Sequence, residues 1–198
     1  MQHGELPFER QLGDARLAID VLVNSAGRGI YGPFLDTALD DELEMLQLNV
    51  ASLTELTKLL APGMVARGTG RIVNVASIAA FAPGPLMACY YATKAYVLSF
   101  SEALATELEG TRVTVTVLCP PATRSRFQAT AGLESSRLIK NQRLFEADDV
   151  ARIGYAGMLA GGRVVVPGFA NWLSTKIVGL VPRGVLGRYV RKLQAPAT

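Results

Sequence analysis

Short runs rich in β-branched residues alternate with two long helical segments, and this alternation most constrains what the chain can fold into. The runs are Ile19–Val23, Arg71–Ala76 and Arg112–Leu118. Apolar runs of this length suit strands that are buried on both faces, as in a parallel sheet. Strands that alternate with long helices predict a single α/β domain with right-handed crossovers. The 198 residues are enough for a sizeable core.

The two helical segments are the longest predicted elements. In Asp36–Arg67 apolar residues recur at three- and four-residue spacing, and Gly68–Gly70 ends the segment. The second segment covers Leu86–Leu108. Asn49 lies in the middle of the first segment among apolar neighbours, so we expect a buried side chain with assigned hydrogen-bond partners.

Smaller elements complete the prediction. A short amphipathic helix is expected within residues 6–17, and a fourth strand at Arg163–Val166. A helix over Asp148–Leu159 is expected to open with an Asp cap. Thr123–Glu146 predicts irregular or weakly helical structure.

Polar residues and prolines stand where the predicted strands end. Asn24 follows the first strand, Ser77 the second, and residues 120–123 the third. In open α/β sheets ligands bind beyond the carboxyl ends of the strands. The sequence therefore predicts a site at this edge of the sheet, independently of any family.

A tyrosine and a lysine, Tyr90 and Lys94, lie four residues apart in the second helical segment and so share a face. Because a nearby ammonium favours the phenolate, we expect Lys94 to lower the pKa of Tyr90 from its ordinary value of about 10. Such a tyrosine can exchange a proton with an alkoxide or alcohol, and Ser77 can hydrogen-bond the same oxygen. A Tyr-x-x-x-Lys pair alone is a weak signal. Tyr91 and Tyr96 are expected to be packing residues.

The joint order of the motifs is more specific than any one of them. The motifs are Asn24-Ser25-Ala26-Gly27, Asn49, Ser77, Tyr90-x-x-x-Lys94 and Pro120-Pro121-Ala122-Thr123. This set resembles the classical short-chain dehydrogenase/reductase family, from about Ile19 to Val166. Ser25 replaces the second Asn of the family's Asn-Asn-Ala-Gly motif, and Pro121 replaces the Gly of its Pro-Gly motif.

The resemblance implies a Rossmann-like, doubly wound parallel sheet and hydride transfer between NAD(P)H and a carbonyl carbon, with NADP favoured over NAD. It makes Tyr90 the general acid/base, and has Ser77 orient and polarise the carbonyl. It has Lys94 bind the nicotinamide ribose and lower the pKa of Tyr90, and Asn49 hold a water of a proton relay. The cofactor-binding residues that it implies are Asn24, Ala26, Gly27, Tyr90, Lys94, Pro120 and Thr123.

The sequence before Ile19 lacks the Thr-Gly-x-x-x-Gly-x-Gly turn with which the family begins, whose glycines let the backbone approach a pyrophosphate. We therefore expect an N-terminally truncated sheet without the first three strands, in which Ile19–Val23 is an exposed apolar edge. A fragment or mis-set start codon, a natural deletion, and strands supplied by another chain are three open explanations. The 198-residue chain is expected to bind a dinucleotide weakly or not at all.

By resemblance, Thr123–Glu146 is the variable substrate lid. Five apolar residues either line a substrate pocket or belong to the core: Ile78, Phe81, Pro83, Met87 and Phe127. If they line a pocket, the substrate is a small hydrophobic ketone or alcohol, with acyl and lipid-like groups among the options. The basic residues of the region could meet an anion, but we expect a solvated loop face. They are Arg124, Arg126, Arg137, Lys140 and Arg143.

Residues 167–198 form a basic tail after the catalytic half, 19–166. Asn171–Leu193 predicts one or two amphipathic helices that are broken near Pro182. Beyond Asp149 the chain holds seven Lys or Arg and no acid, so the formal net charge of +3 divides into +7 there and −4 before it. A membrane-surface helix or a partner groove would suit this composition. Packing of the helices on their own domain is the expectation.

Several other classes are excluded. No run reaches the roughly 18 apolar residues of a membrane helix, and the first residues do not form a signal peptide. We expect a cytoplasmic protein, with contact to a membrane surface left open, and two free thiols, Cys89 and Cys119. The only histidine is His3, near the N-terminus, so a Ser-His-Asp hydrolase is excluded. The sequence contains no cluster of metal-ligating residues, and its overall charge is too small for a nucleic-acid binder.

Three functions remain in competition. An NAD(P)-dependent oxidoreductase leads. A non-catalytic assembly module of the same fold, which keeps the two long helices for homo-oligomer formation, is the second. A peripheral membrane binder that acts through the tail is the third.

Overall fold

The computed structural model describes residues 18–133, 136–140 and 144–196. The helix expected within 6–17 and the side chain of Arg143 therefore lie outside the described residues.

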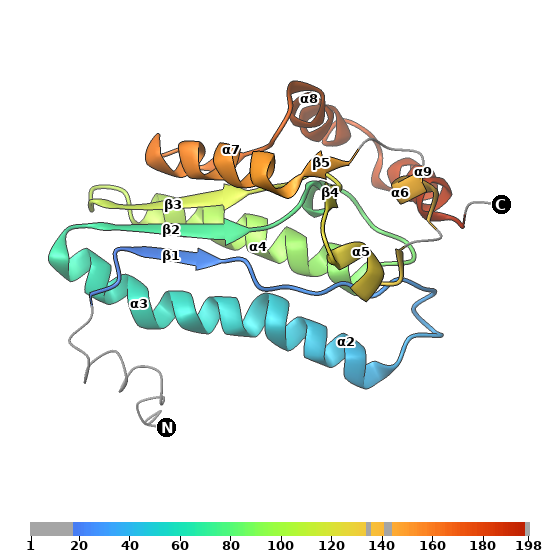
Figure 1. The fold of residues 1–198 in the computed structure, drawn as a ribbon, viewed down its shortest axis with the longest axis horizontal. Helices are drawn as coiled ribbons and strands as arrows, with labels where there is room; N and C mark the ends of the chain where they lie inside the picture. The colour runs from blue at the N-terminus through green and yellow to red at the C-terminus, as the bar shows by residue number, and fades with distance from the viewer. Residues whose placement is uncertain (1–17, 134–135, 141–143, 197–198) are drawn as a thin grey trace.

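A four-stranded parallel sheet forms the centre of the described part of the chain (Figure 1). In spatial order its strands are β1 (Val21–Asn24), β2 (Gly70–Val75), β3 (Val113–Leu118) and β6 (Val164–Val165). Every neighbouring pair is parallel, and the register places Val23 opposite Val73. The predicted α/β class with a parallel sheet is confirmed, and each predicted strand is present with its ends shifted by one or two residues.

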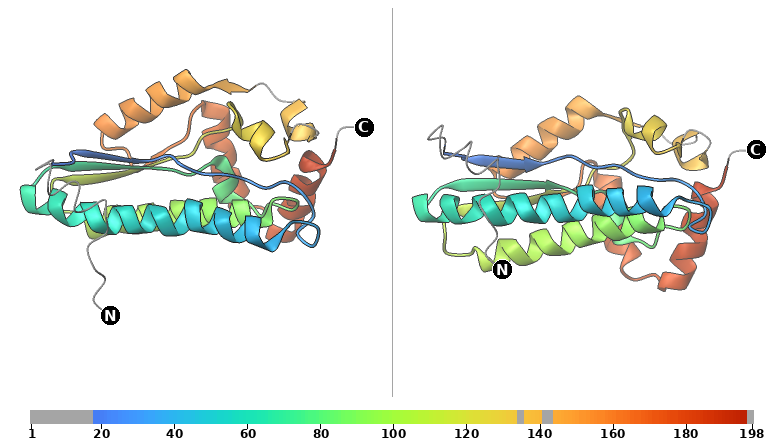
Figure 2. Two further views of the ribbon diagram at one scale, coloured as in Figure 1. Left: turned by 60° about the horizontal axis from the view of Figure 1, so that its bottom comes forward. Right: turned by 90° about the horizontal axis from the view of Figure 1, so that it is seen from below.

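Helices cover both faces of the sheet. Figure 2 shows α3 (Leu53–Arg67) and α4 (Ala88–Glu107) on one face and α7 (Ala147–Leu159) on the other. On the α3 side, Leu22 packs with Met64 and Ile72. Further along, buried Val97 of α4 packs with the β3 side chains. Covering both faces makes this a doubly wound arrangement, as predicted.

The first long helical segment is continuous but not uniform. It consists of α2 (Leu39–Leu46), the π-helix η1 (Gln47–Ser52) and α3. It begins at Leu39 rather than Asp36, because the amide of Asp36 is engaged in a turn with the carbonyl of Pro33. Gly68, with φ of 66°, ends it in the left-handed region that glycine adopts easily.

Two other predicted helix starts are also wrong in detail. The second long helix, α4, begins at Ala88, since Leu86 has a φ of 70° that no helical residue adopts. Helix α7 begins at Ala147 after Glu146, whose side chain forms no capping bond. Asp148 is therefore not the cap. It lies in the first turn, where a negative charge still favours the helix dipole.

The region 123–146 is more ordered than expected. Strand β4 (Thr123–Arg124) pairs in parallel with β5 (Phe145–Glu146), and the helices α5 (Phe127–Thr130) and α6 (Arg137–Lys140) lie between them. Two-residue strands are too short to produce a recognisable sequence pattern.

The tail forms two helices, α8 (Phe169–Val178) and α9 (Arg183–Gln194), with the break at Pro182 that the sequence predicts. On α9 the side chains of Leu186, Val190 and Gln194 are buried at four-residue spacing. The expected packing of the tail on its own domain is therefore confirmed for α9. No helix in the described ranges is long and apolar enough to cross a membrane.

Strand β1 lies at the edge of the described sheet. Val21 and Val23 are 43% and 55% exposed, whereas Leu22 and Asn24 between and after them are buried. One face of β1 is thus covered by α3, and the opposite face is open over the described residues. This agrees with the apolar edge expected from the sequence.

Candidate active site

A cavity of about 1060 Å³ lies at the carboxyl edge of the sheet, where the sequence predicts a site. It is lined by the loops that follow the strands, by α4, and by residues of α5, α7, α8 and α9. The 3-10 helix η2 (Ile78–Phe81) follows β2 and places Ser77 at its N-cap, where the Ser77 hydroxyl accepts a hydrogen bond from Ala79 N at 3.1 Å. The mouth of the cavity therefore gathers segments far apart in the sequence.

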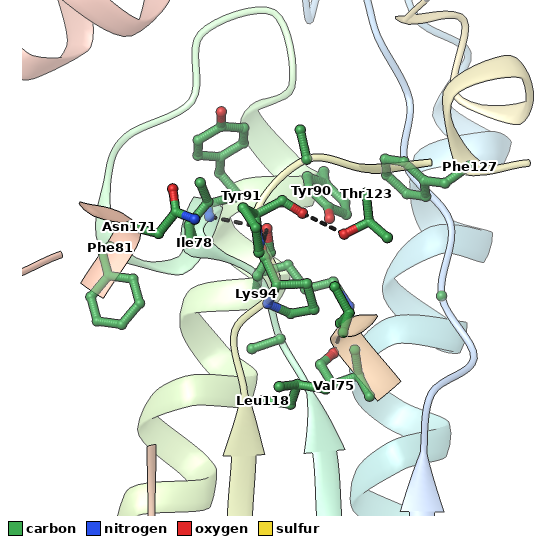
Figure 3. A pocket seen from close by; sticks show the side chains of 18 of the residues that line it. Val75, Ile78, Phe81, Tyr90, Tyr91, Lys94, Leu118, Thr123, Phe127 and Asn171 are labelled. Carbon is green, nitrogen blue, oxygen red and sulfur yellow. Dashed lines mark hydrogen bonds between the residues drawn. The ribbon is translucent and has the colours of Figure 1, made fainter. Parts of the chain in front are cut away.

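Tyr90 and Lys94 both line this cavity from α4, one helical turn apart (Figure 3). Burial raises the pKa of Tyr90 to about 12, and a side-chain hydrogen bond with Ser77 opposes this rise. Lys94 Nζ donates a hydrogen bond to the carbonyl of Val75 at 2.9 Å and lies 5.8 Å from the centre of the Tyr90 ring. Burial lowers the pKa of Lys94 to about 8.

The expected lowering of the pKa of Tyr90 by Lys94 is not what the structure shows. The two side chains are close, but the half-buried Tyr90 packs against apolar neighbours such as Phe127, whose ring centre is 5.2 Å from that of Tyr90. Removing the phenolate from water costs more free energy than the hydrogen bond with Ser77 contributes, so the pKa of Tyr90 rises. Proximity to a cation was inferred correctly, whereas the degree of burial was not visible in the sequence.

Asn49 is buried in the π-helix with every polar atom of its side chain engaged. Its Oδ1 accepts from the amide of Arg28 at 2.9 Å. Its Nδ2 donates to the carbonyl of Arg28 at 2.9 Å and to Thr93 Oγ1 at 3.1 Å. The predicted buried, partnered asparagine is confirmed. The bonds fix the loop after β1 against α4.

Gly27 lies between two of the predicted site residues. A Cβ at this position would stand 3.2 Å from Asn49 Oδ1 and 3.4 Å from Lys94 Nζ. The loop motif, the π-helix and α4 therefore meet at one point of the cavity wall. Ala26 beside it is exposed and does not line the cavity.

Asn24 is held in a buried polar chain rather than in the cavity lining. Its Nδ2 donates to Asn74 Oδ1 at 2.8 Å and to Thr57 Oγ1 at 3.1 Å, and Asn74 donates in turn to Ser101 Oγ at 2.9 Å. This chain joins β1, β2, α3 and α4 behind the site. Sequence reasoning missed Asn74, although an asparagine inside a buried β-branched strand is a signal that could have found it.

The loop after β3 reaches the cavity through Pro120 and Thr123. The carbonyl of Pro120 accepts from the amide of Ile78 at 3.0 Å, which joins this loop to the one that carries Ser77. Thr123 Oγ1 donates to the carbonyl of Pro121 at 2.8 Å. Figure 3 shows Thr123 and Tyr90 among the side chains of the cavity lining.

The apolar residues proposed for a pocket divide into two groups. Ile78, Phe81, Met87 and Phe127 line the cavity, and Pro83 does not. The sequence left open whether these residues line a pocket or belong to the core. Met87 does both, because it belongs to a buried cluster and also faces the cavity. The solvated reading holds for Arg124, Arg126, Arg137 and Lys140, which are exposed and absent from the lining.

Comparison with known proteins identifies the family. Residues 10–136 match the family model for short chain dehydrogenases, which is more than half of the chain. The chain belongs to the short-chain dehydrogenase family. Its parallel sheet agrees with the fold of solved short-chain dehydrogenases.

The curated relatives of this short-chain dehydrogenase include two reductases. It is 41% identical over 102 residues to the ketoacyl reductase HetN of Nostoc sp., which covers 52% of the chain and 36% of the relative. It is 29% identical over 173 residues to the very-long-chain 3-oxoacyl-CoA reductase of Pyrenophora tritici-repentis, which covers 82% of the chain and 49% of the relative. The chain thus spans about half or less of the length of these relatives.

One solved structure is similar over nearly the whole chain. The short-chain dehydrogenase from Sphingobium yanoikuyae in complex with NADPH has a TM-score of 0.74 and 30% identity. The match covers 96% of this chain and 74% of that one. A 7beta-hydroxysteroid dehydrogenase has a TM-score of 0.76 but 21% identity, and shows the shared fold alone.

The residues of this short-chain dehydrogenase fit the nicotinamide end of a dinucleotide. Gly27 leaves the wall beside Lys94 and Asn49 free of a side chain, so a ring or a sugar can approach there. Lys94 and Tyr90 supply an N–H and an O–H donor at the same place. The glycine-rich pyrophosphate turn is absent from the described residues.

Sequence reasoning also missed how the tail closes the cavity. The amide Nε2 of Gln194, on α9, donates to the hydroxyl of Tyr91 at 2.8 Å, and Tyr31 donates to the carbonyl of Gln194. All of Gln194 is buried. Tyr91 is therefore a fastening point for the tail as well as a packing residue. A contact across 103 positions leaves no local signal in the sequence.

Proposed function

We propose that this chain carries the catalytic wall of an NAD(P)-dependent reductase that acts on a hydrophobic ketone or alcohol. The observation that carries the proposal is the convergence of Ser77, Tyr90 and Lys94 on one cavity that is otherwise lined mainly by apolar side chains. Each of the three comes from a place that the sheet topology brings to the same edge. The family assignment supports the reaction class.

Tyr90 is the proposed general acid. With a pKa of about 12 its hydroxyl is fully protonated near neutral pH, so it is ready to give a proton to an alkoxide oxygen formed from a carbonyl. Ser77, which shares a hydrogen bond with Tyr90, can also hold that oxygen and polarise the carbonyl. In the reverse direction the phenolate form of Tyr90 would accept the proton of an alcohol.

Lys94 and its neighbours are the proposed holders of the cofactor. When bound, the nicotinamide supplies or accepts the hydride. Lys94, with Tyr90, would bind the nicotinamide ribose. The other proposed cofactor contacts that line the cavity are Gly27, Pro120 and Thr123, whereas Asn24 and Ala26 lie outside its lining.

NADP is the proposed cofactor in preference to NAD. The NADPH complex of the 30% identical Sphingobium yanoikuyae structure supports this choice. Asn49 is proposed to hold a water that continues the proton relay, through its main chain, because its side chain is fully occupied by Arg28 and Thr93.

A 3-oxoacyl thioester is the first substrate class to test. The cavity is large and mainly apolar, which suits an acyl chain. Two relatives are a ketoacyl reductase and a very-long-chain 3-oxoacyl-CoA reductase, so the relatives point to the same chemistry.

A homo-oligomer built on the long helices is also proposed. Leu39, Leu43 and Leu46 form an exposed stripe on α2 at helical spacing, and α2 contacts α4. An exposed leucine stripe of this kind is typical of a protein–protein interface.

Tyr90→Phe is the direct test of the reaction. The variant keeps the ring in its apolar cluster and removes only the proton donor, so the fold is expected to persist while reduction falls by about a hundredfold or more. NADPH consumption would be followed at one fixed NADPH concentration and compared as kcat/KM for NADPH, which needs no saturation, with 3-oxoacyl thioesters and bulky ketones.

Tyr96→Phe is the matched control. Tyr96 lies on the same helix but stacks on Phe100 and contacts Thr54, away from the cavity. Turnover should survive that change. Equal turnover in the Tyr90 variant and the unaltered chain would refute the assignment. A chain that is folded but inactive with every substrate would favour the non-catalytic assembly module.

A further inference from the structure

The outer face of α8 carries a continuous apolar stripe. Phe169, Trp172, Leu173 and Ile177 recur at three- and four-residue spacing, and Leu180 follows in the turn. Phe169 is 75% exposed and Leu180 is 86% exposed. Side chains of this size that project into water in one row mark an interaction surface rather than ordinary surface residues.

The inner face of the same helix belongs to the cavity. Asn171, Thr175 and Val178 line it, and Asn171 also donates to the carbonyl of Pro167 at 2.8 Å. At 100° per residue these positions lie opposite the apolar stripe. The inner side of the helix therefore faces the cavity, and only the apolar stripe faces outward, where a partner could bind.

Both tail helices also carry cations. Arg188, Arg191 and Lys192 are exposed on the side of α9 opposite buried Leu186 and Val190. Lys176 and Arg183 are exposed as well. Over the described ranges none of these five cations is in an ion pair, whereas Arg152 and Arg163 are paired with acids. Residues 150–198 contain no Asp or Glu to neutralise them.

We propose that this outer tail patch docks on an anionic lipid surface, without crossing it. The patch comprises Phe169, Trp172, Leu173, Lys176, Ile177, Leu180, Arg183, Arg188, Arg191 and Lys192. Helices with aromatic and aliphatic side chains beside unpaired Lys and Arg lie in the membrane interface, where the apolar groups enter the acyl boundary and the cations meet lipid phosphates.

The charge pattern selects lipid over a second copy of the chain. In a two-fold interface the same patch meets itself, so five unpaired cations would face five others with no acid between them. An anionic bilayer supplies both the negative charge and the apolar depth. The inference does not depend on the reaction, and it places the α8 wall of the cavity against the lipid.

Vesicle sedimentation of the full 198-residue chain tests the proposal. We expect binding to phosphatidylcholine vesicles that contain phosphatidylserine, weak binding to phosphatidylcholine alone, and release as ionic strength rises. The double variant Arg188→Gln with Lys192→Gln should lower the partition coefficient by about 25-fold, at about fivefold for each cation near the surface. Phe169→Ser with Leu180→Ser should lower it by about tenfold or more.

Matched controls lie elsewhere on the surface. Arg126→Gln with Lys140→Gln removes two exposed cations, and Leu35→Ser removes an exposed leucine, so both should bind vesicles as the unaltered chain does. Circular dichroism checks that each variant is folded. The proposal is overturned by a chain that stays in the supernatant, by equal binding to neutral vesicles, or by tail variants that bind unchanged. Conversion of a dimer to a monomer by the tail variants, without vesicles, would assign the patch to a second copy and also overturn it.

Discussion

Lys94 and Tyr90 show how burial and charge compete within one turn of a helix. Lys94 is buried and Tyr90 is half-buried, and loss of water moves their pKa values in opposite directions, to about 8 for the lysine and about 12 for the tyrosine. The sequence places the two groups on one face correctly because helical spacing is local. It does not reveal the desolvation, because the apolar side chains around them come from segments such as α5 that only the fold brings near.

The lysine makes a prediction for stability against pH. The folded chain loses its Lys94 proton at about pH 8, and the unfolded chain keeps it to about its ordinary pKa of 10.5. Between these values the unfolded state binds more protons, so the free energy of unfolding gains from rising pH. The gain is at most about 1.4 kcal/mol per pH unit.

Urea unfolding of the unaltered chain and of Lys94→Met, at several pH values from 7 to 10, measures this contribution. The stability of the unaltered chain relative to the variant should rise with pH in that window. Buried Cys119, whose pKa is raised to about 12, is present in both proteins, so its opposing effect largely cancels in the comparison. A difference that stays flat from pH 7 to 10 would contradict the low pKa of Lys94.

At the scale of elements, the long helices and buried strands could be predicted, and the short elements could not. The six-residue strand β3 and the twenty-residue helix α4 are long enough for their apolar residues to form a pattern that can be recognised in the sequence. The β4–β5 pair has two residues a strand and depends on a bond from the amide of Phe145 to the carbonyl of Ala122. The hydrogen bond between Gln194 and Tyr91, which holds α9 over the cavity, likewise depends on tertiary contacts alone.

The leucine stripe on α2 predicts the oligomer. Leu43→Glu places a charge in the proposed interface and is expected to weaken self-association by about tenfold or more, because the carboxylate would have to be buried unpaired. Sedimentation velocity at several protein concentrations measures the change. Leu159→Glu is the control, since Leu159 is 51% exposed against 52% for Leu43 and lies on α7, on the other side of the sheet. A monomer in the unaltered chain would remove the proposal.

At the scale of the whole molecule, the described sheet presents the proposed catalytic wall, and the described residues include no glycine-rich turn. The cavity holds donors for a nicotinamide and its ribose, but a dinucleotide also has a pyrophosphate and an adenosine, which account for much of its binding. The 198-residue chain is therefore expected to bind NADPH and NADH only weakly. The expected dissociation constants are about 1 mM or above, which corresponds to a binding free energy of about −4 kcal/mol or weaker.

Isothermal titration with each nucleotide measures this affinity. A micromolar dissociation constant for either one would contradict the expectation. It would show that residues of the chain other than a glycine-rich turn hold the phosphates. The same titration compares NADPH with NADH directly.

The closing bond between Gln194 and Tyr91 spans 103 positions, and the bond from Tyr31 to Gln194 spans 163. During synthesis the wall that carries Tyr90 and Lys94 leaves the ribosome long before α9 does, because translation proceeds from the N-terminus. For that interval Tyr31 and Tyr91 lack their partner Gln194, and the cavity lacks the apolar α9 side chains that line it. A chaperone that binds apolar surface would find its strongest target at that stage, and would be released when the tail folds over the site.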